Sequence, residues 1–260
     1  MKILHFSRSS YFVVSAFFLT LFLIGYIWWP LVEEYFAYMD WQGPWWLYLD
    51  WLLIGIFLVM SILIMLGANI RQDIKIICVG LIGGLAIESW GTQTNLWTYY
   101  TLERPPLWII PAWPIASLAI DRIVRLLQIN LPKPWRGFYK WSFLGMLCLF
   151  FVMMLFFIAP TFDKPLTWAS TLLVLMTILT TRDYRSSLIV FMAGSGLGYF
   201  LELWGTTREC WVYYTHQTPP VFAVFAHGMA ALIFWRAIKI LDLFVEQRVF
   251  NRIKVWSDDF

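Results

Sequence analysis

Charged residues are scarce in this chain. Only 13% of its 260 residues are Asp, Glu, Lys or Arg, while 60% are hydrophobic and 20% are aromatic. Roughly a quarter of the residues in an ordinary globular protein are charged. A chain with so few charges cannot cover its own surface with polar groups, so the composition excludes a water-soluble globular protein and predicts one that folds in lipid.

Cysteine is also rare, and the three cysteines have no metal-ligand spacing. Cys78 and Cys148 lie in apolar runs and are interpreted as small buried hydrophobic residues, whereas Cys210 stands alone in a predicted loop with no evident disulfide partner. The chain has no phosphate-cradling Gly-rich loop with Lys, no His-rich box, no two-His zinc motif and no Gly-x-Ser-x-Gly elbow. These absences argue against ATP hydrolysis and di-iron chemistry, and we expect neither a metal nor a cofactor.

Long apolar runs, by contrast, fill the chain. A membrane-spanning helix needs about 20 mostly apolar residues. The first run is longer than a signal-peptide core and ends in Trp28-Trp29-Pro30, so we expect it to be retained. The sequence therefore predicts an all-α, polytopic membrane helix bundle with eight spans, at Tyr11–Trp29, Trp45–Leu66, Ile74–Trp90, Leu107–Val124, Trp141–Ala159, Pro165–Thr180, Leu188–Trp204 and Pro220–Leu241.

The basic residues are divided unequally between the two sides that these eight helices define. Only Arg104, Lys164 and Arg208 of the 19 Lys and Arg residues fall on one side. Loops rich in Lys and Arg stay in the cytoplasm. We therefore expect a multi-pass protein of the inner (plasma) membrane, with both termini cytoplasmic. The net charge of +3 is small, and no basic block lies apart from the apolar runs, so we expect no nucleic-acid partner.

The sequence contains an internal repeat with an offset of 114 residues. Residues 84–106 (GLAIESWGTQTNLWTYYTLERPP) and 198–220 (GYFLELWGTTRECWVYYTHQTPP) align without a gap and are identical at 11 of 23 positions. Each copy would hold four helices, an even number, so both halves enter the membrane from the same side and are parallel. The predicted division is a first four-helix repeat at 1–130, a cytoplasmic linker at 131–138 and a second repeat with a cytoplasmic tail at 139–260.

Two glutamates of the repeat, Glu88 and Glu202, lie within predicted membrane helices. Ionisable residues there are costly and suggest a function. Small residues precede each glutamate at four-residue spacing (Gly80 and Gly84; Gly194 and Gly198), which predicts that each carboxyl group faces a neighbouring helix in the bundle interior. One interpretation is that each glutamate tethers the following loop by accepting hydrogen bonds from amides, Trp or Tyr. The other is an acid–base pair or ion site, because burial favours the neutral carboxyl group, which can donate a proton.

The two copies differ where Trp113 in the first half is replaced by His227 in the second. A histidine inside a membrane helix can carry protons, although most such residues only form a hydrogen bond. Glu88, Glu202 and His227 are therefore the candidate catalytic residues. The candidate substrate-binding residues are the polar and aromatic side chains that follow each glutamate, which interfacial anchoring would explain equally well: Trp90, Thr92, Trp97, Tyr99, Tyr100, Trp204, Thr206, Trp211, Tyr213 and Tyr214.

Two aspartates near the predicted ends of helices have simpler interpretations. Asp121 stands beside Arg122, and we expect a local ion pair. Asp50 precedes the second helix on the outer side, where it would join Glu33 and Glu34 in a cluster or be solvated.

The stretch from Glu88 to Thr101 (ESWGTQTNLWTYYT), followed by Pro106 to Trp113 (PLWIIPAW), resembles the carotenoid biosynthesis membrane family that includes carotenoid hydratases. The resemblance covers about 30 residues and returns in the second half. It implies an enzyme that acts on a long isoprenoid within the bilayer, with Glu88 or Glu202 as the proton donor to a double bond.

Three classes of function remain open from the sequence. The first is an enzyme acting on a membrane-dissolved isoprenoid, carotenoid or related lipid through intramembrane carboxylates. The second is a small-solute or proton-coupled transporter whose path is lined by Glu88 and Glu202. The third is a non-catalytic membrane assembly or accessory protein. The partners expected are the lipid bilayer and a hydrophobic isoprenoid or lipid ligand.

Overall fold

The structure, a computed structural model, describes residues 6–131 and 136–258, and nearly all of its regular structure is helical. Most of the predicted linker, residues 132–135, lies outside the described residues. The elements are α1 (Arg8–Ile27), α2 (Trp29–Ala37), η1 (Trp45–Tyr48), α3 (Trp51–Met65), α4 (Ile70–Gln93), β1 (Trp97–Tyr99), α5 (Ala112–Asn130), α6 (Arg136–Ile158), η2 (Ala159–Thr161), α7 (Pro165–Leu179), α8 (Tyr184–Thr207), β2 (Trp211–Tyr213) and α9 (Val221–Asp258).

Each of the eight predicted apolar segments contains a helix, which confirms the all-α prediction. Within the described part of the chain, five helical stretches are long and apolar enough to cross a bilayer: Arg8–Ile27, Ile70–Gln93, Gly137–Thr161, Tyr184–Thr207 and Val221–Leu243. Helices α3 and α7 are apolar but have only 15 residues each, and α5 is amphipathic and carries charges. The protein is therefore a helical membrane protein with at least these five candidate spans.

Two helices begin later than the sequence predicts. The predicted second helix starts at Trp45, but α3 starts at Trp51, because the Asp50 carboxylate accepts a hydrogen bond from the Leu53 amide (3.1 Å) and caps the helix there. The predicted fourth helix starts at Leu107, but residues up to Pro111 form turns and α5 starts at Ala112. Proline lacks a backbone N–H, so the prolines in this stretch favour a turn and a helix start rather than a helix interior.

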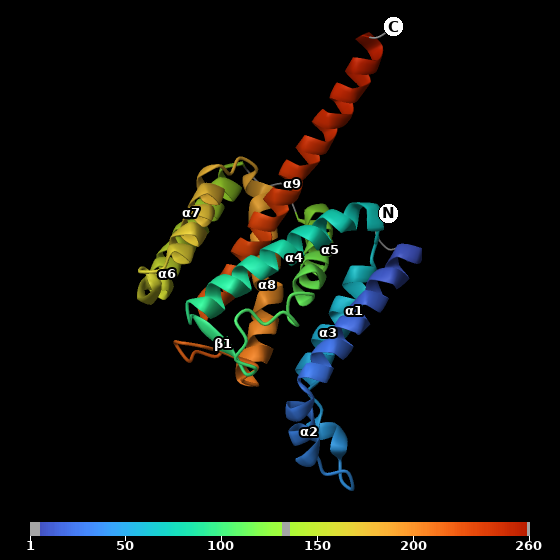
Figure 1. The fold of residues 1–260 in the computed structure, drawn as a ribbon, viewed down its shortest axis with the longest axis vertical. Coiled ribbons are helices and arrows are strands. Elements are labelled where there is room, and N and C mark those ends of the chain that lie inside the picture. Colours follow the sequence, from blue (N-terminus) through green and yellow to red (C-terminus); the bar gives the residue numbers. More distant parts are fainter. Residues whose placement is uncertain (1–5, 132–135, 259–260) are drawn as a thin grey trace.

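The bundle has two ends and two flanks (Figure 1). The described N-terminal and C-terminal ends of the chain lie at one end, while α2 and β1 lie at the other. The α1–α3 pair forms one flank and the α6–α7 pair the opposite flank, with α4, α5, α8 and α9 between them. Two chain segments far apart in sequence, α4 and α9, thus pack side by side at the centre.

Glycine faces bring the central helices together. A Cβ atom added at Gly84 would lie 2.4 Å from Cγ of Trp113 on α5, and one added at Gly198 would lie 2.4 Å from Cβ of His227 on α9. Gly80 approaches the backbone of Pro114 in the same way. These contacts confirm that the four-residue spacing of small residues marks a helix–helix interface.

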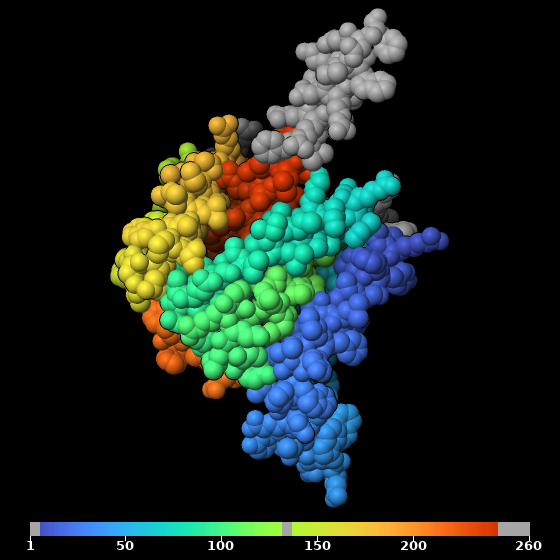
Figure 2. All heavy atoms as spheres, viewed as in Figure 1, coloured from blue at the N-terminus to red at the C-terminus, as the bar shows by residue number. Residues whose placement is uncertain are grey.

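The outer surface of the bundle is apolar, as expected of helices in contact with lipid. Phe12, Leu19 and Phe22 of α1 are all more than 60% exposed. Helices α1, α4 and α5 make up much of the face seen in Figure 2. Cys78 and Cys148 belong to this exposed surface, so the prediction that they are buried is wrong. In a membrane protein, an apolar run does not reveal which residues face the core and which face the lipid, because both environments are apolar.

A buried ion-pair network lies near the ends of α4 and α5 that are remote from β1. Nη1 of Arg122 lies 2.5 Å from Asp121, which confirms the predicted ion pair, and Arg125 lies 2.8 Å from the same carboxylate. Nη2 of Arg122 also donates to Asp73 at 2.7 Å, a contact that the sequence analysis missed. Arg122 and Asp73 are both fully buried. A buried charge without a partner is strongly destabilising. Separating α4 from α5 would leave both charges without a partner, so this ion pair holds the two helices together.

Candidate functional site

Glu88 projects from α4 and is 3% exposed. Its Oε2 accepts a hydrogen bond from the Trp97 indole (3.1 Å), and its Oε1 accepts from the Tyr99 hydroxyl (2.9 Å) and from the Trp113 indole (3.1 Å). Two of these donors belong to the loop that follows α4. The carboxylate therefore tethers its own loop, as one of the two interpretations of the sequence proposes.

Glu202 projects from α8, is also 3% exposed, and has an equivalent environment. The Trp211 indole donates to its Oε2 at 3.0 Å, and the Tyr213 hydroxyl donates to its Oε1 at 2.8 Å. The third partner is Nε2 of His227, 2.9 Å from Oε1. The second carboxylate differs from the first only in having an imidazole where the first has an indole.

The tyrosine hydroxyls at these carboxylates stay protonated. Burial, followed by the nearby carboxylates, raises the pKa of Tyr99 and of Tyr213 well above the usual value. Each hydroxyl therefore keeps its proton and serves as a fixed donor. Among the six groups that bond the two carboxylates, His227 is the one imidazole, whose ring nitrogen can either donate or accept a hydrogen bond.

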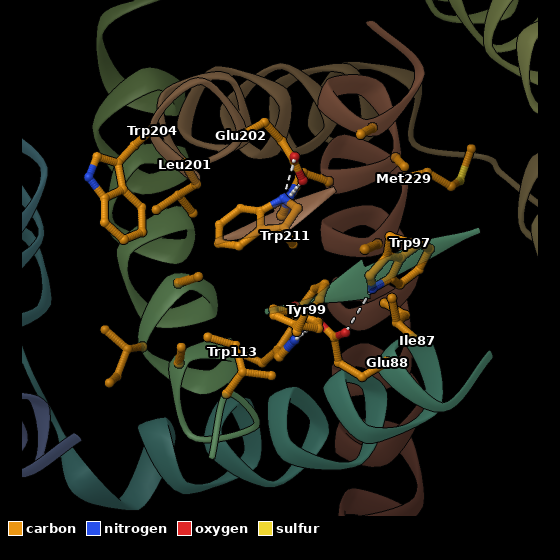
Figure 3. Close-up of a pocket in the computed structure, with 18 of the residues that line it drawn as sticks. Ile87, Glu88, Trp97, Tyr99, Trp113, Leu201, Glu202, Trp204, Trp211 and Met229 are labelled. Carbon is orange, nitrogen blue, oxygen red and sulfur yellow. Dashed lines mark hydrogen bonds and ion pairs between the residues drawn. The ribbon is translucent and has the colours of Figure 1, made fainter. Parts of the chain in front are cut away.

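The two carboxylate environments are in direct contact. Strands β1 and β2 pair antiparallel, with Trp97 opposite Tyr213 and Tyr99 opposite Trp211. The Trp113 and His227 rings stack with centroids 5.8 Å apart and planes inclined by 18°. Figure 3 shows Glu88 and Glu202 on opposite sides of one pocket, with Tyr99 and Trp211 between them. Trp97 thus faces the counterpart of Tyr99, and Tyr99 faces the counterpart of Trp97, as in two similar segments related by a twofold axis.

The backbones of the two loops also correspond residue by residue. Left-handed φ values occur at Asn95 and Glu209 and again at Leu102 and His216, pairs that are each 114 residues apart. Cis peptide bonds precede Pro105 and Pro219 at the same offset. The repeated sequence thus folds into a repeated local structure.

An apolar cavity of about 310 Å³ joins the carboxylates to both flanks of the bundle. Its lining runs from Phe17 and Phe57 on the α1–α3 flank to Met154 and Val174 on the α6–α7 flank. Glu88, Glu202 and His227 are the acidic and basic side chains of this lining. Of the candidate substrate-binding residues, those that line it are Trp90, Trp97, Tyr99, Trp204, Trp211 and Tyr213.

The other four candidate substrate-binding residues have structural contacts. The Thr92 and Thr206 hydroxyls donate to the carbonyls of Glu88 and Glu202 within their own helices (2.5 and 2.6 Å). The Tyr100 hydroxyl donates to the carbonyl of Ile27 at the end of α1, and the Tyr214 hydroxyl to that of Phe157 near the end of α6 (2.8 and 2.7 Å). None of these residues is among those that line the cavity.

Two tryptophan indoles form hydrogen bonds between the two halves of the chain. Trp90 Nε1 donates to Thr167 Oγ1 at the start of α7 (3.2 Å), and Trp204 Nε1 donates to Asp50 at the start of α3 (2.8 Å). Asp50 also accepts from Nε of Arg208 at 3.0 Å. The sequence left open whether Asp50 joins Glu33 and Glu34 or is solvated. In the structure its carboxylate instead accepts hydrogen bonds from the Leu53 amide, the Trp204 indole and the Arg208 guanidinium group.

One residue of the site, Trp113, was noted in the sequence only as the counterpart of His227 and not as a member of the site. Its position beside Gly84 is the available signal, since glycine leaves room for a large ring at that point. In the part of the chain that the structure describes, no group of three or more His, Cys, Asp or Glu side chains is arranged to hold a metal ion. Comparison with protein-family models, curated proteins and solved structures finds no match to this chain.

Proposed function

We propose that this protein is an acid–base enzyme of the inner membrane that acts on a double bond of a long, apolar, membrane-dissolved substrate such as an isoprenoid. The observation that carries the proposal is the Glu202–His227 hydrogen bond at the wall of an apolar cavity. A proton can move along this one bond, because either group can hold it. The Glu88 carboxylate accepts hydrogen bonds only from two indoles and a tyrosine hydroxyl, which keep their protons. Glu88 therefore faces the same cavity without a partner to exchange a proton with.

The groups in the cavity wall can carry out protonation of a double bond. A proton passes from the Glu202–His227 pair to one carbon of a C=C bond, whose π electrons form the new C–H bond and leave a carbocation on the neighbouring carbon. Loss of a different proton to the pair gives an isomerised alkene, and addition of water with loss of its proton to the pair gives an alcohol. Aromatic faces attract cations. The indoles of Trp97 and Trp211 and the Glu88 carboxylate are placed to stabilise such an intermediate.

The resemblance of residues 88–113 to the carotenoid biosynthesis membrane family supports the same substrate class. A transporter of small polar solutes is less well supported, because apart from the carboxylates, His227 and the tyrosines the cavity lining is almost entirely apolar. The non-catalytic alternative has one observation in its favour, which is that all four carboxylate oxygens already have hydrogen-bond partners.

Lipid and pigment profiles of cells test the proposal. We expect a strain lacking the gene and a strain carrying Glu88→Gln with Glu202→Gln to accumulate the same apolar precursor, which the intact gene removes. The double variant must be present in the membrane at the normal level. If both profiles match that of the parent strain, the protein does not act on a cellular lipid and the glutamates are loop tethers.

The proposal includes eight spans in two parallel four-helix halves, with both termini in the cytoplasm. The matching loops at one end of the bundle and the shared position of the chain ends support it (Figure 1). Helices α3 and α7 are shorter than the bilayer core, since 15 residues extend about 22 Å and the core is about 30 Å thick. The 3₁₀ turns η1 and η2 precede α3 and α7 in the chain, and in the proposed topology they would add to the length of each crossing.

Reporter fusions check the crossings by α3 and α7. We expect a reporter enzyme that works only outside the cytoplasm to be active when fused after Asp40 or Asp163, and inactive when fused after Asn69 or Arg182. These positions flank the two short helices. Equal activity on both sides of either helix would remove that helix from the spans, and a reversed pattern would invert the orientation.

A further inference from the structure

A second hollow lies at the other end of the bundle, away from the carboxylates. It has a volume of about 470 Å³ and is bordered by α4, α5, α8 and α9. Four cationic side chains (Arg71, Lys75, Arg125 and Lys239) and two carboxylates (Asp121 and Asp242) line it, so it has an excess of two positive charges. We refer to it as the basic groove.

The two carboxylates of the basic groove are already engaged by cations. Asp121 accepts from Arg122 and Arg125, and Asp242 is paired with Lys75 across the groove between α9 and α4. Lys239 lies 3.7 Å above the ring of Trp235 and 3.8 Å from the exposed Asp183. Arg71 is exposed and makes no ion pair with any residue that the structure describes.

The repeat gives Arg71 an internal comparison. Its counterpart 114 residues later is Arg185, which donates to the carbonyls of Gln128 and Leu131 at the end of α5 (3.1 and 3.2 Å). The guanidinium group of the second half therefore holds backbone carbonyls at the end of α5, which belongs to the first half. In the first half the same position faces the basic groove with its donors available to a ligand.

Apart from Gln72 and Ser117, the remaining residues that line the groove are apolar or aromatic. Ile76, Ile120, Val124 and Phe234 line it beneath the cations. Next to it, α4 and α9 expose apolar side chains outward, including Ile74 (48%) and Ile240 (50%). A cationic rim above an apolar floor, continuous with lipid-facing helix surfaces, matches an amphiphile whose phosphate lies at the rim and whose chains extend along the helices.

We propose that the basic groove binds the phosphate of an anionic phospholipid headgroup. In the orientation proposed above, with both termini in the cytoplasm, the groove lies in the cytoplasmic leaflet, where anionic lipids are concentrated. Arg71 is the principal contact, with Lys75 and Arg125 beside it. The site is independent of the cavity chemistry and would hold lipid whatever reaction the carboxylates perform.

The test measures the thermal stability of the full-length protein purified in a neutral detergent and titrated with phosphatidylglycerol or phosphatidylcholine. We expect phosphatidylglycerol to raise the melting temperature more than phosphatidylcholine does. Arg71→Gln should weaken the apparent affinity for phosphatidylglycerol about fivefold. Arg182→Gln is the matched control, because Arg182 is an exposed arginine of the same side that does not line the groove.

Three other outcomes decide against parts of the proposal. Equal stabilisation by the two lipids would overturn it, as would equal losses in Arg71→Gln and Arg182→Gln. Stabilisation by inorganic phosphate in detergent alone, abolished by Arg71→Gln, would keep the phosphate site but replace the lipid by a soluble anion. Arg71 makes no described contact that a glutamine would break, so loss of folding is not expected to obscure the result.

Discussion

Replacing His227 by glutamine is expected to abolish turnover while the protein remains folded. Glutamine can still form a hydrogen bond to Glu202, but it cannot take up or release a proton. Because the His227–Glu202 contact is the one hydrogen bond at either carboxylate that joins two groups able to carry a proton between them, its loss should reduce the rate by about 10²–10⁴-fold. Conversion of the precursor identified by lipid profiling, measured in membranes with equal amounts of protein, gives the rate.

The repeat supplies the control for this experiment. Trp113 occupies the corresponding position beside Glu88, so Trp113→Phe removes an equivalent hydrogen bond without removing a titrating group. We expect Trp113→Phe to destabilise the protein by about 1–3 kcal/mol and to change turnover much less than His227→Gln does. His227→Trp, which gives the second site the side chain of the first, should be as inactive as His227→Gln. Equal losses of activity in Trp113→Phe and His227→Gln would show that both residues only support the structure.

Alanine at Gly205 is expected to cause a large loss of stability. A Cβ atom there would lie 2.0 Å from the ring of Trp211, which also donates to Glu202. The Trp211 ring must move, and this movement disturbs both its hydrogen bond to Glu202 and the pairing of β2 with β1. Overpacking of this kind costs about 1–3 kcal/mol and occasionally more. Thermal unfolding in detergent should therefore show a fall of several degrees, and Gly91→Ala should behave alike because its Cβ would lie 1.8 Å from Trp97.

Gly196 is the matched control on the same helix. An added Cβ atom meets nothing within 4 Å there, so Gly196→Ala should raise stability by about 0.5–1 kcal/mol through the higher helix propensity of alanine. If Gly205→Ala and Gly196→Ala shift the melting temperature equally, the close packing of Trp211 on α8 does not contribute to stability.

The sequence was sufficient for the features that depend on local pattern. Each apolar run predicted a helix, and the structure has a helix within each run. The four-residue spacing of Gly80, Gly84 and Glu88 identified the face of α4 that packs on α5. The tether from Glu88 to its loop was also foreseeable, because Trp97 and Tyr99 follow closely in the chain.

Features that depend on distant parts of the chain were not predictable. The pairing of β1 with β2 involves three residues from each loop, too few for a strand pattern, and arises because the two loops meet. The Asp73–Arg122 ion pair joins residues 49 positions apart, and no local signal marks Asp73 as buried. Helix α2 was not predicted either. It follows α1 almost directly, and its aromatic residues are as compatible with a loop at the membrane surface as with a helix.

The contact between Trp113 and His227 has a consequence for how such a site can arise. If a single four-helix chain assembled as a symmetric pair, one codon would specify both positions, and the two carboxylates would have to share the same partner. Joining the copies in one gene lets each position change alone. In this chain the third partner of one carboxylate is the Trp113 indole, and the third partner of the other is the His227 imidazole. Two identical subunits could not differ in this way, because each would carry the same residue at that position.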